Sequence, residues 1–297
     1  MADFSEKDLS EIINSASSLK SNPLSKSDYL KNKSIALIFA KPSLRTRVSF
    51  EVGIIQLGGQ VITIKMDEIS VGIRENVEDI ANVLSRYVSA IVIRTYEQEQ
   101  IKALDKFSLV PVINGLSDEE HPCQIIADLF TIYETFNGFS DLKLSYVGDG
   151  NNVAQGMLLG CALAGIDIAI ASPDKHKIKD SYVNLAKKIN PKIKIELTSN
   201  PKIATTNANI LYTDVWTSMG QEKEIEARKK TFAPYQINSQ LLSFAKKDAI
   251  VLHCLPAHKG QEISADVFDK FSKTIYEQAE NRLHAQKAIL LKLLAPG

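Results

Sequence analysis

Cysteine is scarce in this sequence, and its charge is balanced. The 297 residues include only three cysteines, Cys123, Cys161 and Cys254, which stand far apart and without C-x-x-C spacing. That usage fits a reducing compartment better than a disulfide scaffold, and it offers no second ligand pair for a structural zinc site. Lysine plus arginine and aspartate plus glutamate both number 35, so the formal net charge is zero. A neutral chain argues against nucleic acid or a membrane surface as partner, so any anion must be bound locally.

Long apolar runs and targeting signals are also missing. No stretch reaches the roughly 18 uninterrupted apolar residues that a membrane span needs. The amino terminus, MADFSEKDLSEI, begins with acidic residues and lacks the basic start and apolar run of a signal peptide. Internal repeats and low-complexity linkers are absent as well. With 44% hydrophobic and 24% charged residues the composition is that of an ordinary globular protein, and we expect it in the cytoplasm.

The sequence does contain a regular succession of short apolar runs and longer helical patterns. Each run is mostly apolar on both faces, as buried parallel strands are. The segments between them, such as RVSFEVGIIQLGG and PCQIIADLFTIYETF, repeat apolar residues at helical spacing. This alternation predicts an α/β fold with parallel sheets flanked by helices. The predicted strands are residues 34–40, 60–65, 90–94, 109–113, 143–148, 167–172, 192–197, 209–213 and 249–254.

The length favours two domains of about 130 to 150 residues each. The segment TIYETFNGFSDL ends a long helix at Asn137 and Gly138 and then begins a new series of strands and helices. We therefore place the first domain at residues 1–135 and the second at residues 136–276. The last segment, residues 277–297, is a periodic helix that must bury a leucine-rich face, and we expect it to pack back on the first domain.

The stretch AKPSLRTRVSFE, residues 40–51, concentrates positive charge where a predicted strand leads into a helix. Ligands of α/β proteins bind at the carboxyl ends of strands. A helix start offers backbone N–H groups and the positive end of the helix dipole, and Arg45 adds a bidentate donor beside Ser43 and Thr46. The stretch therefore predicts a phosphate site without a Walker glycine pattern. The alternative is a capped helix with solvated arginines.

Four single residues are further candidates. Arg94 closes an apolar strand, and His121 stands near a helix start with its ring available to donate a hydrogen bond. Cys254 follows another strand beside His253, where a thiol can be ionised and reactive. Arg282 belongs to a polar patch on the terminal helix. Each has a simpler explanation, since an arginine can extend into water and a cysteine can be a packed core residue.

Two loops of the second predicted domain also stand out. V-G-D-G-N-N-V-A, residues 147–154, follows a strand, and Asp174 follows the next strand. This pattern nearly imitates the dinucleotide fingerprint, but Val153 replaces its third glycine. D-V-W-T-S-M-G contains the only tryptophan and places Asp214 and Ser218 four residues apart. That arrangement suits a substrate with a cationic amine beside a carboxylate.

Four ordered motifs carry a family resemblance: S-L-R-T-R, H-P-C-Q-x-x-A-D, D-V-W-T-S-M-G and H-C-L-P. Together they resemble the aspartate/ornithine carbamoyltransferase family, and the last two resemble its ornithine-specific members. The resemblance implies a ligand site in the interdomain cleft and two substrates, carbamoyl phosphate and L-ornithine, which give L-citrulline and phosphate in arginine biosynthesis. It also implies direct transfer without metal or cofactor, and a homotrimer or a multiple of trimers.

The resemblance further assigns roles to individual residues. It implies that Arg45 and His121, with Thr46, stabilise the oxyanion of the tetrahedral intermediate. It also implies that Cys254 and Asp214 lower the pKa of the substrate amine or take its proton. The residues implied for carbamoyl phosphate are Ser43, Leu44 through its backbone, Arg45, Thr46, Arg94, His121, Gln124, Cys254, Leu255 and Arg282. Those implied for ornithine are Asn152, Asp214, Ser218 and Met219.

Three positions depart from the family's pattern. Leu44 stands where a threonine is usual, so one side-chain donor to phosphate is absent although the backbone N–H remains. Ala40 stands where an acidic residue is common. In the loop of residues 66–75, Ser70 replaces a glutamine that many relatives supply to a neighbouring subunit, and Ser70 and Arg74 are the candidate substitutes.

Two other functions stay open at this point. A sister carbamoyltransferase could use putrescine or N-acetylornithine, because a small change in a pocket selects the amine. A nucleotide-dependent dehydrogenase could use the G-D-G-N-N loop and Asp174, although no residues for hydride transfer follow.

Overall fold

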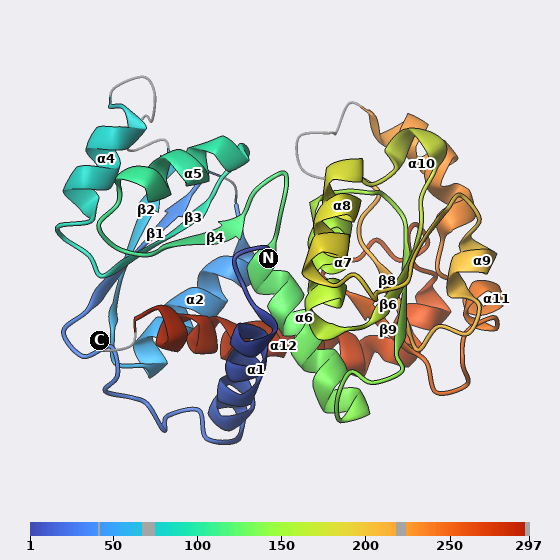
Figure 1. The fold of residues 1–297 in the computed structure, drawn as a ribbon, viewed down its shortest axis with the longest axis horizontal. Helices are drawn as coiled ribbons and strands as arrows, with labels where there is room; N and C mark the ends of the chain where they lie inside the picture. Colours follow the sequence, from blue (N-terminus) through green and yellow to red (C-terminus); the bar gives the residue numbers. More distant parts are fainter. Residues whose placement is uncertain (41, 67–74, 218–223, 295–297) are drawn as a thin grey trace. The chain divides into compact units, whose positions relative to one another are not determined.

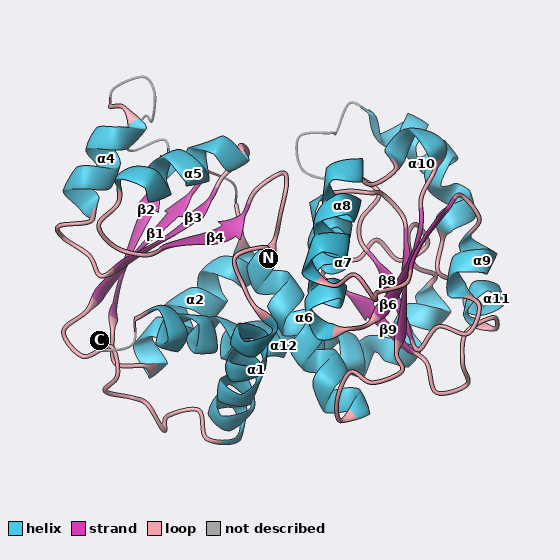
Figure 2. Cartoon of the chain, in the orientation of Figure 1, coloured by secondary structure: helices cyan, strands magenta, loops and turns pink. Residues whose placement is uncertain are grey.

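The computed structural model shows two parallel β-sheets, each flanked by helices (Figures 1 and 2). All nine predicted strands occur in the described part of the chain. The alternation of short apolar runs and helical patterns therefore predicted the fold class correctly. The structure describes residues 1–40, 42–66, 75–217 and 224–294.

The chain forms two compact units. The first unit comprises Lys7–Phe130 and Glu280–Gly297, and the second comprises Met1–Glu6 and Thr131–Ala279. The chain passes between the units at the start of helix α1 (Glu6–Ser21), within helix α6 (Pro122–Phe136) and within helix α12 (Ala265–Leu293).

The sheet of the first unit has the strand order β2-β1-β3-β4, and all its neighbouring pairs are parallel. The central strands β1 and β3 are buried along nearly their whole length, because their β-branched and aliphatic residues meet helices on both faces. Edge strand β2 is largely exposed, which differs from the expectation that every strand is buried. The strands are β1 (Ser34–Phe39), β2 (Gln60–Lys65), β3 (Ala90–Arg94) and β4 (Val112–Leu116).

Helices α4 and α5 cover one face of this sheet, and α2 lies against the other (Figure 1). The last part of α12 also packs within this unit: Tyr29 Oη donates to the Leu291 carbonyl at 2.9 Å, and buried Lys287 donates to the Pro23 carbonyl at 2.6 Å. The helices of the unit are α1 (Glu6–Ser21), α2 (Leu44–Gln56), α4 (Val77–Leu84) and α5 (Gln98–Phe107), with the first part of α6 and the last part of α12.

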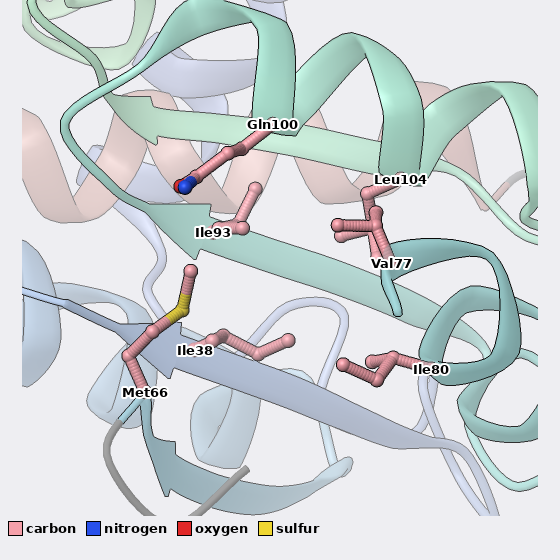
Figure 3. Close-up of a pocket in the computed structure, with 7 residues that line it drawn as sticks. All are labelled: Ile38, Met66, Val77, Ile80, Ile93, Gln100 and Leu104. Carbon is pink, nitrogen blue, oxygen red and sulfur yellow. The ribbon is translucent and has the colours of Figure 1, made fainter. Parts of the chain in front are cut away.

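A small cavity lies between the first sheet and helices α4 and α5 (Figure 3). Its volume is about 10 Å³, and its lining is apolar apart from one amide side chain. It is too small and too apolar to bind a polar metabolite, so it is a packing defect of the core. The lining residues are Ile38, Met66, Val77, Ile80, Ile93, Gln100 and Leu104.

The sheet of the second unit has the order β7-β6-β5-β8-β9 and is also parallel. Helices α7 and α8 pack on one face, and α9, α10 and α11 lie on the other (Figure 1). The strands are β5 (Lys143–Val147), β6 (Asp167–Ala171), β7 (Ile195–Thr198), β8 (Ile210–Thr213) and β9 (Ile250–His253). The helices are α7 (Asn152–Ala164), α8 (Asp180–Ile189), α9 (Pro201–Thr205), α10 (Ile225–Phe232) and α11 (Ser239–Leu242).

Strand boundaries differ from the prediction by one residue at most except in β4 and β7, and the start of helix α12 differs as well. Strand β4 begins at Val112 rather than at residue 109, because Pro111 cannot donate a ladder hydrogen bond and Leu109 is exposed. Strand β7 begins at Ile195 rather than at residue 192. Helix α12 already begins at Ala265 and so includes 12 residues before the predicted start at residue 277.

Candidate active site

The candidate loops of the first unit follow β1 and β3, the strands at which the chain order of the sheet reverses. In an open α/β sheet, ligands bind outside the carboxyl ends of the strands at such a switch point. Ala40 N donates to the Arg94 carbonyl at 2.8 Å, which ties the two strand ends together. Strand topology therefore brings the S-L-R-T-R loop next to Arg94.

The S-L-R-T-R loop turns directly into helix α2. Ser43 is the N-cap residue by position and has an extended backbone, but its side chain makes no capping hydrogen bond. Leu44 is the first helical residue and is 73% exposed, whereas the Thr46 side chain is buried. The first N–H groups of a helix have no intrahelical acceptor. The loop therefore offers backbone donors, two hydroxyl groups and Arg45 at the positive end of the helix dipole.

Two further arginines lie against this helix start. Arg94 Nη1 donates to Ser43 Oγ at 3.2 Å and to Thr46 Oγ1 at 3.3 Å. Arg282 Nη2 donates to the same Thr46 hydroxyl at 3.1 Å, and Arg282 itself is fully buried. Within the described residues Arg94 forms no ion pair with a carboxylate, and its Nε has no hydrogen-bond partner. Two cationic side chains thus share one hydroxyl group as acceptor.

The charges of this cluster change the proton affinities of its members. Burial, followed by the charges of Arg282 and Arg45, lowers the pKa of Arg94 to about 10. Burial and the charges of Arg282, Arg94 and Arg45 hold the pKa of His121 well below its ordinary value of 6.5. Like charges held this close repel one another, and an anion between them would relieve the repulsion. The cluster has the electrostatics of an anion site, and His121 is neutral there at pH 7.

Helix α6 contributes a neutral polar side chain to the same cluster. Gln124 Oε1 accepts a hydrogen bond from Arg282 Nη1 at 2.6 Å, and Gln124 Nε2 donates to Asp128 Oδ1 at 2.8 Å. His121 precedes the helix and is buried, and its Nδ1 has no partner in the part of the chain that the structure describes. Cys123 is buried, and its pKa rises to about 11 because of that burial. Cys123 is therefore a packing residue.

In the second unit, Asp214 is the centre of a hydrogen-bond network. It follows β8 and is buried, and its Oδ1 accepts from Cys254 Sγ at 3.0 Å and from Val215 N at 2.8 Å. Its Oδ2 accepts from Asn151 Nδ2 at 2.8 Å. Cys254 is partly exposed. The structure therefore pairs the predicted thiol and carboxylate, which are 40 residues apart in the sequence.

The G-D-G-N-N loop does not have the geometry that a dinucleotide site needs. A Cβ atom on Gly150 would lie 2.5 Å from the Ile178 backbone nitrogen, so this glycine is required by the protein's own chain. The Asn151 side chain caps α7 and occupies its first N–H groups, accepting from Val153 N at 3.0 Å and Ala154 N at 3.1 Å. Asp174 is exposed and pairs with Lys177. These contacts leave a bound pyrophosphate without its usual donors.

A buried arginine joins the loops after β5 and β8. Arg228, on α10, donates through Nε to the Trp216 carbonyl at 2.5 Å and through Nη2 to the carboxylate of Asp149. Its guanidinium also lies over the Phe232 ring, 4.9 Å from the ring centroid. Burial raises the pKa of Asp149, and the positive charge of Arg228 opposes that rise. Arg228 therefore stabilises the segments that carry Asn151 and Asp214.

The H-C-L-P loop is held by a buried histidine. His253 Nδ1 accepts from Leu255 N at 2.8 Å, so Nε2 carries the ring proton and faces Glu262 Oε1 at 3.1 Å. Leu255 has a positive φ of 60°, which a residue with a side chain rarely adopts. The hydrogen bond from its N–H fixes the backbone on the carboxyl side of Cys254.

The predicted site residues thus form two groups. The structure brings Ser43, Arg45, Thr46, Arg94, His121, Gln124 and Arg282 together in the first unit, with Leu44 at the same helix start. It brings Asp214 and Cys254 together in the second unit, with Asn152 and Leu255 directly beside residues that contact them. Ser218 and Met219 lie outside the described residues, as do Lys41, Ser70 and Arg74.

The sequence did not single out Asn151, Arg228 or Glu262, and it placed Gln286 only in the polar patch around Arg282. Gln286 Oε1 accepts from Arg282 Nη2 at 2.8 Å, one helical turn along α12. Asn151 could have been recognised, because an asparagine between a strand and a helix is a preferred N-cap. No local pattern marks Arg228 or Glu262, since both act through contacts with distant segments.

Neither a membrane span nor a metal cluster is found in the part of the chain that the structure describes. None of the described helices has both the length and the hydrophobicity needed to cross a membrane. Among the described His, Cys, Asp and Glu residues, no group of three or more is arranged to hold a metal ion.

Comparison with known proteins identifies the family. Residues 1–134 match the family model of the aspartate/ornithine carbamoyltransferase carbamoyl-P binding domain, and residues 140–293 match that of its Asp/Orn binding domain. The chain is 50% identical to an ornithine carbamoyltransferase of Archaeoglobus fulgidus over 296 residues, which cover 99% of this chain and 96% of that protein. A Nostoc ornithine carbamoyltransferase is 48% identical, covering 99% of this chain and 95% of the relative.

Solved structures agree with these sequence matches. The ornithine carbamoyltransferase of Pyrococcus furiosus aligns with a TM-score of 0.95 at 40% identity, covering 100% of this chain and 96% of that one. The enzyme of Thermus thermophilus aligns with a TM-score of 0.89 at 38% identity, covering 98% and 96%. Since both halves of the chain match, and the arginine cluster and the thiol–carboxylate pair stand at the ordered motifs, this chain belongs to the aspartate/ornithine carbamoyltransferase family.

Proposed function

We propose that the protein is an ornithine carbamoyltransferase, which transfers the carbamoyl group of carbamoyl phosphate to the side-chain amine of L-ornithine. The products are L-citrulline and phosphate, in arginine biosynthesis. The observation that carries this assignment is the hydrogen bond of 3.0 Å from Cys254 Sγ to Asp214 Oδ1. A buried carboxylate attracts an ammonium group and can accept its proton, whereas it would repel aspartate as a substrate. The names of the relatives support the same substrate.

The first unit would bind carbamoyl phosphate. Ser43, Arg45, Thr46 and the Leu44 backbone N–H would contact the phosphate group at the start of α2. Arg94 and Arg282 already converge on Thr46, so they are placed to balance the negative charge of the phosphate as it leaves. Gln124 and a neutral His121 would hydrogen-bond the carbamoyl group.

The reaction would proceed in three steps. The ornithine ammonium group loses a proton to Asp214 or, through Cys254, to solvent. The free amine then forms a bond to the carbamoyl carbon, and the carbonyl oxygen becomes an oxyanion that Arg45, Thr46 and His121 stabilise. The C–O bond to phosphate breaks last, and the leaving phosphate takes the bonding electrons and the second proton of the attacking nitrogen, which leaves the neutral ureido group of citrulline. No covalent intermediate with the enzyme is needed, and both substrates must be bound at once.

The ornithine carboxylate and α-amine would be held by Asn152, Ser218 and Met219, and Leu255 would contact the carbamoyl group beside Cys254. We assign residues 1–135 with 277–297 to the carbamoyl phosphate domain and residues 136–276 to the ornithine domain. The two matching family models support a boundary between residues 134 and 140, and the grouping of Glu280–Gly297 with Lys7–Phe130 in one compact unit supports the place of the terminal helix.

We also propose a homotrimer, or a multiple of trimers, located in the cytoplasm. An apolar row on α2 supports self-association, because its members are exposed and lie at helical spacing. Light scattering would measure the assembly, and a monomer would contradict it. The row comprises Leu44, Val48, Val52 and Ile55.

The direct test supplies carbamoyl phosphate with L-ornithine, L-aspartate, putrescine or N-acetylornithine in separate reactions and measures the ureido product. Turnover with ornithine at a kcat/KM far above the other three is the expected result. Activity with aspartate and none with ornithine would refute the assignment. A preference for putrescine or N-acetylornithine would move the protein to a sister carbamoyltransferase.

A further inference from the structure

Asn151, the first asparagine of G-D-G-N-N, contacts the side chain at the centre of the proposed ornithine chemistry. Its Nδ2 donates to Asp214 Oδ2 at 2.8 Å. Neither the sequence motif nor the family resemblance assigned it a role, since the resemblance pointed to the neighbouring Asn152. Its contacts therefore need an explanation of their own.

The orientation of the Asn151 amide is determined by its surroundings. Its Oδ1 accepts from three donors: Val153 N at 3.0 Å, Ala154 N at 3.1 Å and Tyr146 Oη at 3.2 Å. Reversing the amide would place its NH₂ group against two backbone N–H groups and its oxygen against the Asp214 carboxylate, which breaks the bonds to Val153, Ala154 and Asp214. Tyr146 is a dependable donor, because burial and nearby acidic groups raise its pKa well above 10.0. The amide nitrogen must therefore face Asp214.

The orientation of the Asp214 carboxylate follows from that of the amide. Oδ2 is held by Asn151, and Oδ1 accepts from Val215 N at 2.8 Å and Cys254 Sγ at 3.0 Å. Rotation about the terminal side-chain bond would move both oxygens away from their donors. Charge-assisted hydrogen bonds of this kind are among the stronger ones in proteins. Asn151 thus restrains the oxygen that faces the thiol, although it does not touch the thiol itself.

We propose that Asn151 is a positioning residue for the carbamoyl transfer: it holds the Asp214 carboxylate in the orientation in which one oxygen faces Cys254 and the substrate amine. The inference rests on the proposed function, because it assumes that Asp214 acts on ornithine. Asn151, at the start of α7, thus acts on the reacting amine through Asp214. Asn151 then has two separable tasks, capping α7 through Oδ1 and orienting Asp214 through Nδ2.

The two tasks can be separated by substitution. Serine is also a preferred N-cap, so Asn151→Ser preserves a cap for α7 but cannot place a donor where Nδ2 stands. Asn151→Ala removes both the cap and the donor. Asn151→Asp keeps the size and the cap and places a second carboxylate against Asp214.

If the orientation of the Asp214 carboxylate matters, Asn151→Ser should lower kcat/KM for ornithine about 10- to 100-fold, the effect of one hydrogen bond to a charged group. Its KM for carbamoyl phosphate and its melting temperature should stay close to those of the wild type.

A binding measurement that does not depend on turnover completes the test. Ornithine should protect Cys254 from alkylation by iodoacetamide in the presence of saturating phosphate, and Asn151→Ser should need at least 10-fold more ornithine for the same protection. In the double variant Asn151→Asp/Asp214→Asn, donor and acceptor are exchanged. It should regain the melting temperature that Asn151→Asp loses but not the turnover, since the carboxylate no longer faces the thiol.

The outcomes separate this proposal from the proposed function. Wild-type kcat/KM for ornithine in Asn151→Ser, with a loss only in Asn151→Ala, would show that Asn151 is merely a helix cap and would overturn the inference. A similar rise in the KM values of both substrates in Asn151→Ser would also overturn it, because that result indicates general disorder. A wild-type protein that makes no citrulline and is not protected by ornithine would instead refute the proposed function.

Discussion

Arg282 donates through Nη2 to the Thr46 hydroxyl at 3.1 Å, although the two residues lie 236 positions apart. Both side chains are buried, and Arg282 is anchored by Gln124 and Gln286 as well. The last helix therefore supplies a cation to the loop that follows β1. An arginine that looked like a solvated helix residue is a structural part of the anion site.

Substitutions at Leu44 can test whether this position binds phosphate through its backbone N–H group alone. Proline is tolerated as the first residue of a helix, and Ser43 already has the extended backbone that must precede a proline. Leu44→Pro should therefore fold normally, but it loses the N–H group. Its KM for carbamoyl phosphate should rise about 10-fold or more. Steady-state kinetics with carbamoyl phosphate varied would measure this.

Leu44→Ala is the matched control, because the leucine side chain is 73% exposed while alanine keeps the N–H group. It should bind carbamoyl phosphate as the wild type does. Equal KM values for the proline and alanine variants would show that the backbone donor is not used.

Arg45 and Arg47 provide a second comparison within one loop. Arg47 is exposed and pairs with Glu51 at 3.7 Å, so Arg47→Ala should change kcat/KM by no more than a few-fold. Arg45→Ala removes a cation from the proposed oxyanion and phosphate contacts and should lower kcat about 100- to 1,000-fold. Lys41→Ala should also lose far less than Arg45→Ala, because only Arg45 can form a bidentate clamp. Similar losses in all three variants would contradict the proposed phosphate contacts.

The lowered pKa of His121 predicts that the protein loses stability in mild acid. Burial and three arginine charges hold its folded-state pKa well below the ordinary 6.5, so below pH 6.5 the unfolded chain takes up a proton that the folded chain does not. The free energy of unfolding should fall as pH decreases, by up to about 1.4 kcal/mol per pH unit from this residue. Above pH 6.5 the two states bind equal numbers of protons at this site, and the effect vanishes.

Urea unfolding of the wild type and of His121→Gln at pH 7.5 and 5.5 would measure this contribution. The wild type should lose roughly 1.4 kcal/mol more than the variant between the two values. All other ionisable groups are the same in both proteins, so their contributions cancel in the comparison. The same pH dependence in both would mean that His121 is protonated in the folded state.

Arg228 should be important for stability. Removing it leaves the largely buried carboxylate of Asp149 without its counter-charge and the Trp216 carbonyl without its donor. We expect Arg228→Met to lower the free energy of unfolding by about 3 kcal/mol at pH 8. Without Arg228 the pKa of Asp149 in the folded state rises further. As pH falls, Asp149 is therefore protonated at a higher pH in the folded state than in the unfolded state. The loss in free energy of unfolding should consequently become smaller at lower pH.

The double variant Asp149→Asn/Arg228→Met is the control, because it removes the uncompensated charge. It should be more stable than Arg228→Met alone at pH 8, as chemical denaturation would show. Additive losses from the two substitutions would indicate that the ion pair makes no net contribution.

The sequence predicted the strands and most of the candidate residues because those properties are local. Apolar runs of strand length marked all nine strands, and the carboxyl ends of strands marked the loops with Arg45, Arg94, Asp214 and Cys254. Edge strands were harder to predict. The exposure of β2 depends on which strand lies beside it and not on its own composition.

The sequence by itself determined the α/β fold class, the ordered motifs and the kind of chemistry that each loop can support. Only the tertiary structure decided which side chains meet. Arg282 reaches Thr46 because α12 packs against α2, and Asp214 meets Asn151 because β8 lies beside β5 in the sheet. It also decided that Asn151 contacts Asp214: the N-cap side chain at the start of α7 lies against the end of the neighbouring strand. Hydrogen bonds and burial depend on distances in space, and those distances exist only once the chain has folded.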